Sequence, residues 1–340
     1  MQFLRRVLIF VAVAALAFLI WKLRSVLVLL FGAVLIATIV RAIAGPLMRW
    51  MRLPERLAVL VAVLAIAGTI AGVGWLIGSR VIQQAQLLAT TLPQSARRLD
   101  QQLAPFGLGK VAESALSSLS ETSRSGMKLA GLLSSGTFVL GSFLIVFFGG
   151  IFLAAQPKLY ETGFIKLIPE ERRKTIELAL FEAEKALRLW LKGQLWAMLL
   201  VGVMTWAGLT LLGVESPIAL ALISGLLEFI PYAGAITSAI PAIMVALVQG
   251  PELALWTTLL YVLVHHVEAY IIQPLIQQFA VEIPAALALF SLLTFGLLFG
   301  FVGILLAVPL AVVSYVLVKR LYVIETLDTE TPIPGDSKEA

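Results

Sequence analysis

The sequence predicts an all-α integral membrane protein with about eight transmembrane helices, a re-entrant helical hairpin and amphipathic extramembrane helices. Three observations support this fold class. Sixty per cent of the 340 residues are hydrophobic and only 13% are charged, whereas a soluble domain is about half apolar and a quarter charged. Apolar runs long enough to cross a bilayer recur along the chain. The apolar stretch from Gly213 to Pro309 is broken repeatedly by proline and glycine.

The spans follow from length, because a transmembrane helix needs about 20 apolar residues. Six runs meet this requirement: Phe3–Trp21, Val26–Ala44, Leu57–Gly78, Leu129–Ala155, Gln194–Gly213 and Leu253–Gln273. After Pro284, the apolar run to Val318 is long enough for two short helices that turn around Gly300 to Gly303. The expected number of spans is therefore eight.

Two further apolar segments are too short to span. Ile218–Ile230 would rise only ~20 Å as a helix, less than the ~30 Å hydrocarbon core, and Ala235–Val248 is equally short. We expect them to form a re-entrant hairpin that turns at Pro231-Tyr232-Ala233-Gly234, with two full spans as the alternative. A helix broken at bilayer depth frees backbone groups that must be buried in protein or line a cavity. Such segments indicate a solute pathway.

Other prolines and glycines within the apolar runs mark expected helix breaks or hinges. These are Pro241, Gly300, Gly303 and Pro309.

Six regions follow from these assignments. They are residues 1–78 (the first three spans), 79–128 (an extracytoplasmic amphipathic helical region), 129–155 (the fourth span), 156–193 (cytoplasmic amphipathic helices), 194–322 (a C-terminal transmembrane core with the broken hairpin) and 323–340 (a disordered cytoplasmic tail). In the cytoplasmic region, Pro169 followed by two glutamates favours a helix start. Glu184 and Arg188 can form an ion pair four residues apart on that helix.

The orientation follows from the basic residues. With the N-terminus inside, 17 of the 25 lysines and arginines lie on the inner side and 8 on the outer side. The positive-inside rule selects this arrangement. Both termini are therefore expected in the cytoplasm.

Few ionisable residues fall within the apolar segments, where charge is costly and usually faces a cavity or a partner. Glu228 precedes the hairpin turn, where it could meet a cation or cap the hairpin in a watery vestibule. His265 and Glu268 are three residues apart and share a helix face. They could form either a polar clamp between helices or part of a proton pathway. Arg41, near the inner end of its span, is expected to extend to the membrane interface.

The sequence lacks the motifs that identify several classes of enzyme. The chain has no cysteine, which excludes thiolate metal sites and cysteine nucleophiles. It contains no phosphate-binding G-x4-G-K-[ST] loop, no H-E-x-x-H and no G-x-S-x-G. The only histidines are adjacent, which argues against zinc hydrolysis. No enzymatic activity, catalytic residue, metal site, cofactor or nucleic-acid partner is expected.

Several short motifs together resemble the autoinducer-2 exporter family of bacterial membrane proteins, from about Phe3 to Tyr322. They are Lys192-Gly193-Gln194, Leu212-Gly213-Val214, Phe229-Ile230-Pro231-Tyr232-Ala233-Gly234, Glu268…Gln273-Pro274, Ile283-Pro284, Phe299-Gly300-Phe301-Val302-Gly303 and Ala307-Val308-Pro309.

The resemblance implies a multi-pass protein of the bacterial inner membrane that assembles as a homo-oligomer, a pentamer. It implies export of the quorum-sensing signal autoinducer-2 or, as in other members, sodium–proton antiport. The chain departs from the family pattern at Glu228, where an uncharged residue is usual, and at Ala235, where proline is common. Glu282 with Ile283 alters the approach to Pro284.

We therefore predict a secondary transporter or facilitator that exports a small polar solute. The expected substrate pathway comprises Glu228, Pro231, Tyr232, Gly234, His265, Glu268, Gln273 and Pro274. The first alternative is Na⁺(Li⁺)/H⁺ antiport, with a monovalent cation as the partner. The second is a membrane scaffold that holds a partner with its outer helices. The substrate, coupling ion, transport direction and oligomer number stay open.

Overall fold

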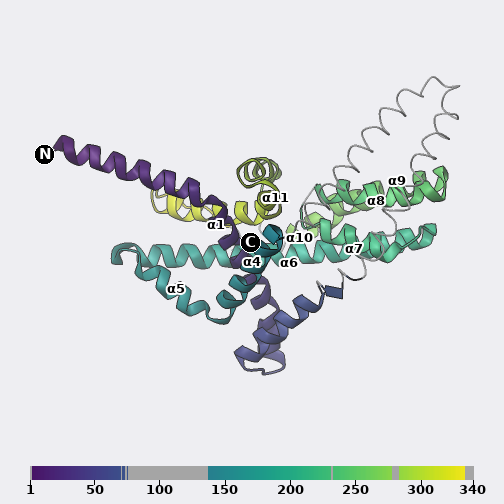
Figure 1. Cartoon of the computed structure of the whole chain (residues 1–340), viewed down its shortest axis with the longest axis horizontal. Helices are drawn as coiled ribbons and strands as arrows, with labels where there is room; N and C mark the ends of the chain where they lie inside the picture. Colours follow the sequence, from purple (N-terminus) through teal and green to yellow (C-terminus); the bar gives the residue numbers. More distant parts are fainter. Residues whose placement is uncertain are drawn as a thin grey trace, which may run out of the picture. The chain divides into compact units, whose positions relative to one another are not determined.

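The computed structural model describes residues 2–69, 71–72, 75, 137–230, 233–277 and 283–333, and this part of the chain contains helices and no strand. Figure 1 labels the helices. The chain forms two compact units. Unit 1 comprises Met1–Val63, Ser142–Trp190 and Val281–Ala340, and unit 2 comprises Leu64–Gly141 and Leu191–Ala280. The predicted outer region, 79–128, lies outside the described residues.

Helix α1 runs without interruption from Gln2 to Trp50, over 49 residues. The separation into the two spans Phe3–Trp21 and Val26–Ala44 was wrong. The four residues between them include neither glycine nor proline, so the backbone has no reason to break. The Arg24 guanidinium lies 4.4 Å from the centroid of the Trp21 ring. Charged side chains on the helix surface interrupt an apolar run without ending the helix.

In unit 1, α4 (Thr137–Ala155) is followed by α5 (Pro157–Lys166) at an angle of 89°. Helix α4 packs closely on α1. A Cβ atom added at Gly150 would lie 2.6 Å from Ile36 and 2.9 Å from the backbone oxygen of Ala33. Small residues permit this close approach of two helix backbones in a membrane protein.

Helix α6 (Glu170–Leu212) has 43 residues and begins directly after Pro169. The predicted ion pair between Glu184 and Arg188 is confirmed. The helix continues through the predicted boundary between residues 193 and 194, so the amphipathic helix and the fifth span form one element. Its residues up to Trp190 belong to unit 1, and those from Leu191 belong to unit 2.

In unit 2, α7 (Pro217–Leu227) packs beside α8 (Ala233–Gln249), so the two segments form a helical hairpin (Figure 1). Helix α7 rises only ~17 Å over its 11 residues; its re-entrant position in the membrane stays a prediction. A Cβ atom at Gly234 would collide with the backbone oxygen of Leu227. Only glycine lets α8 begin this close to the end of α7.

Helix α9 (Pro251–Val267) packs beside α8 and continues through a π-helical segment, η2 (Glu268–Ile272), into α10 (Gln273–Gln277). The predicted span Leu253–Gln273 was too short at its C-terminal end, because the helix continues past Pro274 to Gln277. The backbone N–H of Gln273 donates to the oxygen of Glu268, five residues earlier. This wider turn lies directly before Pro274, whose missing N–H would interrupt a regular α-helix.

Helix α11 (Ala285–Val318) is followed by the π-helical segment η3 (Lys319–Ile324). Inside α11, Gly300 has φ 65° and ψ −144°, values far from helical. A Cβ atom at Gly303 would collide with the backbone oxygen of Phe295, although these residues would be ~12 Å apart along a straight helix. The chain therefore reverses at Gly300, where glycine tolerates the positive φ.

Two prolines expected to break helices lie within helical segments that continue past them. Pro241 lies within α8 and Pro309 within α11, and neither ends its helix. Their role as hinges stays a prediction.

The structure describes the C-terminal segment as far as Ile333, and the disordered tail expected from residue 323 stays a prediction. Lys319 Nζ donates to the backbone oxygen of Pro332 over 2.9 Å, and Ile333 is buried. Residues 334–340 lie outside the described residues.

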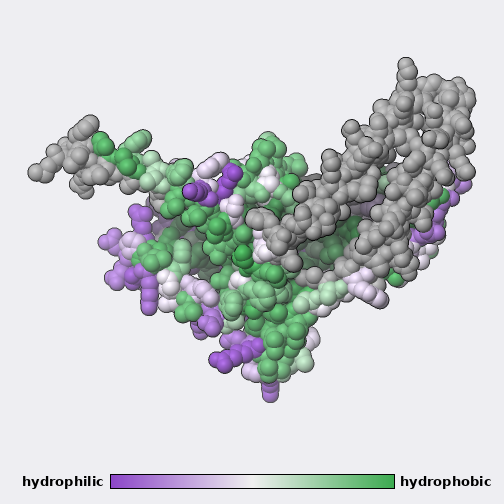
Figure 2. Space-filling model, in the orientation of Figure 1, coloured by the Kyte–Doolittle hydropathy of each residue, from purple (hydrophilic) through white to green (hydrophobic). Residues whose placement is uncertain are grey.

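Within the described residues, four helical segments are long and apolar enough to cross a membrane, or five if the bent pair α4 and α5 counts as one span. The predicted number of eight is not confirmed. Large apolar side chains face outward in both units: Leu211 is 88% exposed and Leu297 79%. Figure 2 shows such hydrophobic residues over much of the visible face. Exposed apolar surface on this scale is typical of a protein in contact with lipid.

Candidate functional site

Unit 2 contains a small polar cavity of about 10 Å³. This volume is close to the minimum that holds one water molecule. Helices α6, α7, α8 and α9 with η2 all contribute side chains to it. The lining residues are Val201, Thr205, Ser224, Glu228, Ala235, Ser238, Tyr261, Val264, His265 and Glu268.

Glu228 is the most unusual of these residues. It follows the last residue of α7, and its backbone N–H donates to the Ser224 oxygen over 3.0 Å. Its side chain is completely buried, and neither carboxylate oxygen has a hydrogen-bond partner within the described part of the chain. Buried polar groups are almost always hydrogen-bonded, and a buried carboxylate requires a proton, a cation or a donor. Glu228 therefore marks a position where a proton, a cation or a hydrogen-bond donor would be stabilised.

Glu268 presents the second carboxyl group and is only 4% exposed. Its Oε2 lies 3.0 Å from His265 Nδ1, where a protonated ring nitrogen donates to a carboxylate. Gln273 Nε2 donates to its Oε1 over 3.4 Å. The first residue of η2 thus connects α9 to α10 through its side chain. π-Helical turns occur frequently at functional sites.

Hydroxyl groups complete the lining. Ser224 Oγ lies 2.8 Å from the Tyr261 hydroxyl and donates to the Leu220 oxygen over 3.0 Å. Ser238 Oγ donates to the Ala235 oxygen over 3.1 Å. The buried Thr205 hydroxyl has no partner within the described residues. The cavity therefore offers carboxylate and hydroxyl oxygens, which can receive a proton, a hydroxyl group or a cation.

The backbone around Glu228 is held from α6. Gln194 is buried, and its Nε2 donates to the backbone oxygen of Glu228 over 2.6 Å. This bond satisfies a carbonyl at the end of α7 that accepts from no backbone N–H among the residues that the structure describes. A Cβ atom at Gly225 would lie 2.8 Å from the Met198 oxygen and 3.4 Å from the Gly202 Cα. The two glycines let α7 approach α6 closely enough for the Gln194 contact.

The predicted pathway residues divide into three groups. Glu228, His265 and Glu268 line the cavity, and Gln273 reaches it through Glu268. Gly234 shapes the hairpin, whereas Pro274 is exposed and does not line the cavity. Pro231 and Tyr232 lie outside the described residues.

The two adjacent histidines differ in their surroundings. His265 faces Glu268, whereas His266 is exposed, with its Nδ1 2.7 Å from the Val262 oxygen and its ring 6.0 Å from that of Tyr270. Successive residues on a helix point about 100° apart. Only His265 therefore belongs to the cavity.

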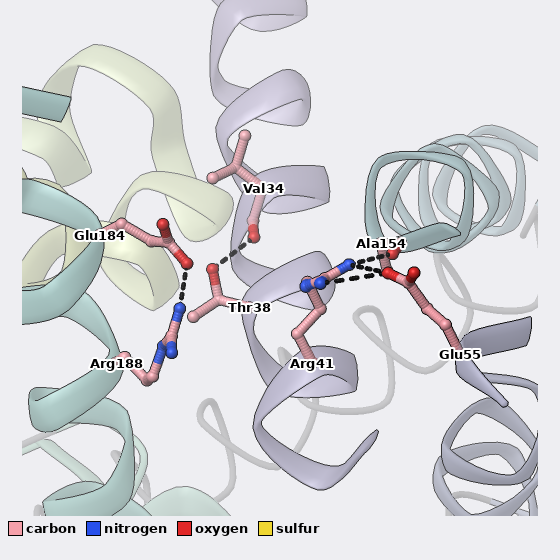
Figure 3. Close-up of polar contacts among 7 residues, drawn as sticks. All are labelled: Val34, Thr38, Arg41, Glu55, Ala154, Glu184 and Arg188. Carbon is pink, nitrogen blue, oxygen red and sulfur yellow. Dashed lines mark hydrogen bonds and ion pairs between the residues drawn. The ribbon is translucent and has the colours of Figure 1, made fainter. Parts of the chain in front are cut away.

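Arg41, in unit 1, is 30% exposed and has polar partners, and its predicted extension to the membrane interface stays a prediction. Its Nη1 donates to the backbone oxygen of Ala154 over 2.8 Å, and the guanidinium lies 3.3 Å from Glu55 Oε1 (Figure 3). A guanidinium carries five donors in a rigid fork. Arg41 consequently links α1 to α4 and to the helical residues 55–69.

Sequence reasoning missed the residues whose role depends on contacts between helices. Gln194 appeared only as part of a motif, and Ser224, Ser238 and Tyr261 were not singled out. Polar side chains within apolar helices are a usable signal, because they seek partners on neighbouring helices. That signal alone does not tell which partner each one finds.

Comparison with known proteins gives a consistent result. Residues 8–322 match the family described as AI-2E family transporter. Two relatives from Bacillus subtilis (strain 168) are each named "Putative transport protein". YueF is 23% identical over 86% of this chain. YrrI is 28% identical over 56% of this chain. The AI-2 transport protein TqsA of Escherichia coli (strain K12) is 33% identical over 34% of this chain.

The extent of these matches differs. The aligned region covers 83% of YueF but only 54% of YrrI and 34% of TqsA. The family match, in contrast, includes nearly the whole chain, from within α1 to within η3. This chain therefore belongs to the AI-2E transporter family.

Proposed function

We propose that the protein exports a small polar solute across the bacterial inner membrane as a secondary transporter or facilitator, with the cavity of unit 2 as its polar centre. One observation carries the proposal: Glu228 is fully buried with both carboxylate oxygens unpartnered in the described residues, beside Glu268. A buried, unsatisfied acidic group at a broken apolar helix has no evident role in stability. Intramembrane carboxylates usually belong to substrate or proton pathways.

The cavity is far smaller than any metabolite, so passage requires the surrounding helices to separate. Proton exchange at the cavity would involve Glu228, Glu268, His265 and Tyr261, the titratable groups that face it from α7, α9 and η2. AI-2 is the first solute to test, because the relative TqsA is named an AI-2 transport protein. Cytoplasmic termini and assembly as a homo-oligomer are parts of the same proposal.

The test is flux of AI-2 in proteoliposomes that contain the full chain, measured with and without a pH gradient. Glu228→Gln with Glu268→Gln should lower flux at least about tenfold, because intramembrane ionisable groups usually belong to substrate or proton pathways. Glu252→Gln is the matched control, because Glu252 lies on α9 but is exposed. A thermal unfolding curve checks that each variant is folded.

Three outcomes would count against the proposal. Unchanged flux in the double variant would remove the roles of Glu228 and Glu268. Sodium-driven proton movement without solute flux would indicate cation–proton antiport. Absence of any flux in the wild type, with binding of a partner protein, would favour the scaffold.

A further inference from the structure

Unit 1 contains a pocket of about 610 Å³ between α1, α5, α6 and α11 that the proposed function does not use. The wall formed by α1 presents Phe31, Val34, Thr38 and Arg41. These residues follow one another at spacings of three or four and therefore share one helix face. Over ~15 Å of helix, the wall changes from apolar to cationic.

The wall formed by α6 has the same mixture. Leu180 and Phe181 are apolar, whereas Glu184 and Arg188 are charged. Figure 3 shows Glu184 and Arg188 opposite the part of α1 that carries Thr38. The pocket is consequently amphipathic on both walls, and its volume is that of a typical small-molecule site.

The charges of the lining do not balance. Arg41, Lys158 and Arg188 face Glu161 and Glu184, an excess of one positive charge. Arg188 pairs with Glu184, and Arg41 contacts Glu55, which lies outside the pocket. Among the described residues, Lys158 forms no ion pair. Its exposed ammonium group is therefore available to an anion.

The position of α5 indicates where that anion comes from. The helix lies at 89° to α4, and none of its residues is buried. Leu159 and Phe164 are 62% and 53% exposed, beside the exposed Lys158 and Lys166. A short helix with exposed apolar and basic side chains is typical of the membrane interface, with its axis in the membrane plane. At this depth the phosphate groups of lipids meet basic side chains.

We propose that this pocket binds one anionic phospholipid of the surrounding bilayer. The ammonium group of Lys158 receives the phosphate, and an acyl chain packs against Phe31, Val34 and Phe181. The ammonium group of Lys158, which forms no ion pair among the described residues, selects an anionic headgroup, and the apolar walls require a chain that a free phosphate lacks. The proposal is independent of transport, because binding is measured without a solute.

The test is native mass spectrometry of the detergent-solubilised full chain with three probes: dioleoyl phosphatidylglycerol, dioleoyl phosphatidylcholine and glycerol 3-phosphate. We expect preferential adducts of phosphatidylglycerol and no saturable adduct of glycerol 3-phosphate. Lys158→Glu should lower the affinity for phosphatidylglycerol about tenfold, since each basic residue near the lipid surface contributes to the binding free energy of anionic lipid. Lys166→Glu, on the same helix but outside the pocket, should change it less than about twofold.

A second variant tests the apolar wall. Phe181 is 62% exposed, so Phe181→Ala should fold. It should weaken phosphatidylglycerol and phosphatidylcholine binding alike.

The proposal is overturned if phosphatidylglycerol and phosphatidylcholine bind the wild type equally, or if Lys158→Glu behaves like Lys166→Glu. Binding of glycerol 3-phosphate as strong as that of the lipid would also overturn it, because the apolar walls would then have no role. If Lys158→Glu changes the oligomeric mass and leaves lipid adducts unaltered, the face is an interface between copies of the chain.

Discussion

The cavity of unit 2 and the pocket of unit 1 place charged side chains among apolar helices in opposite ways. In unit 2 the carboxyl group of Glu228 is fully buried, its oxygens have no partner in the described residues, and the space beside it is about 10 Å³. In unit 1 the pocket is about 610 Å³, and Arg41 and Arg188 are both paired with glutamates.

The difference indicates two kinds of role. Paired, partly exposed charges satisfy one another and contribute little to stability, so they can form the rim of a permanent binding pocket. An unpartnered buried carboxyl group is unfavourable in the closed state. Such a group is expected where the protein has another state in which the group is satisfied, as in a transporter that opens and closes.

The largest stability effect should come from the glycine beside the unit 2 cavity. Gly234→Ala forces a methyl group onto the backbone oxygen of Leu227, which should destabilise the protein by about 3 kcal/mol. Gly163→Ala, in α5 beside the unit 1 pocket, has no atom within 4 Å of the added Cβ and should be neutral or slightly stabilising. The free energy of unfolding of both variants is measured by SDS titration in detergent. Equal changes in this free energy would contradict the difference in packing at the two glycines.

The next largest change in stability should come from side chains that donate a hydrogen bond to a backbone oxygen of another helix. Gln194→Leu removes the buried donor to the Glu228 oxygen and should reduce the free energy of unfolding by about 2 kcal/mol. Arg41→Met removes the donor to the Ala154 oxygen. Because Arg41 is 30% exposed, water can donate to this oxygen instead, and the free energy of unfolding should fall by only about 1 kcal/mol. The same titration measures both, and a larger loss at Arg41 would reverse the comparison.

The smallest effects should differ in sign. Glu228→Leu replaces an unsatisfied buried polar group by an apolar one and should raise the free energy of unfolding by about 1 kcal/mol, although flux is lost. Glu184→Leu breaks an exposed ion pair and should lower it by about 0.5 kcal/mol. If Glu228→Leu is less stable than the wild type, the carboxyl group has a structural partner and the argument for a functional cost fails.

Parts of both units were predictable from local patterns. The start of α6 after Pro169 and the Glu184–Arg188 pair follow from helix rules that involve only neighbouring residues. The contact of His265 with Glu268 also arises within a single helical turn. The short helices α7 and α8 followed from the prolines and glycines that delimit their apolar runs.

The errors have a common origin. The runs Phe3–Trp21 and Val26–Ala44 were read as two spans, but α1 continues through the charged residues between them. A span was predicted to end at Gln273, but a π-helical turn accommodates Pro274 and the helix continues. In both places a local signal was weaker than the continuity of the helix, since ending a helix leaves backbone groups that need new partners.

The sequence by itself determined that the chain is an apolar, all-helical protein with interrupted segments, because composition and helix-breaking residues act locally. It also placed Glu228, His265 and Glu268 among apolar residues. Only the tertiary structure decided that these three meet at one cavity, that Gln194 holds the backbone beside it, and that Arg41 is paired with Glu55. These contacts join residues from different helices, and helix packing sets them through side-chain shape along the whole interface, which no local pattern contains.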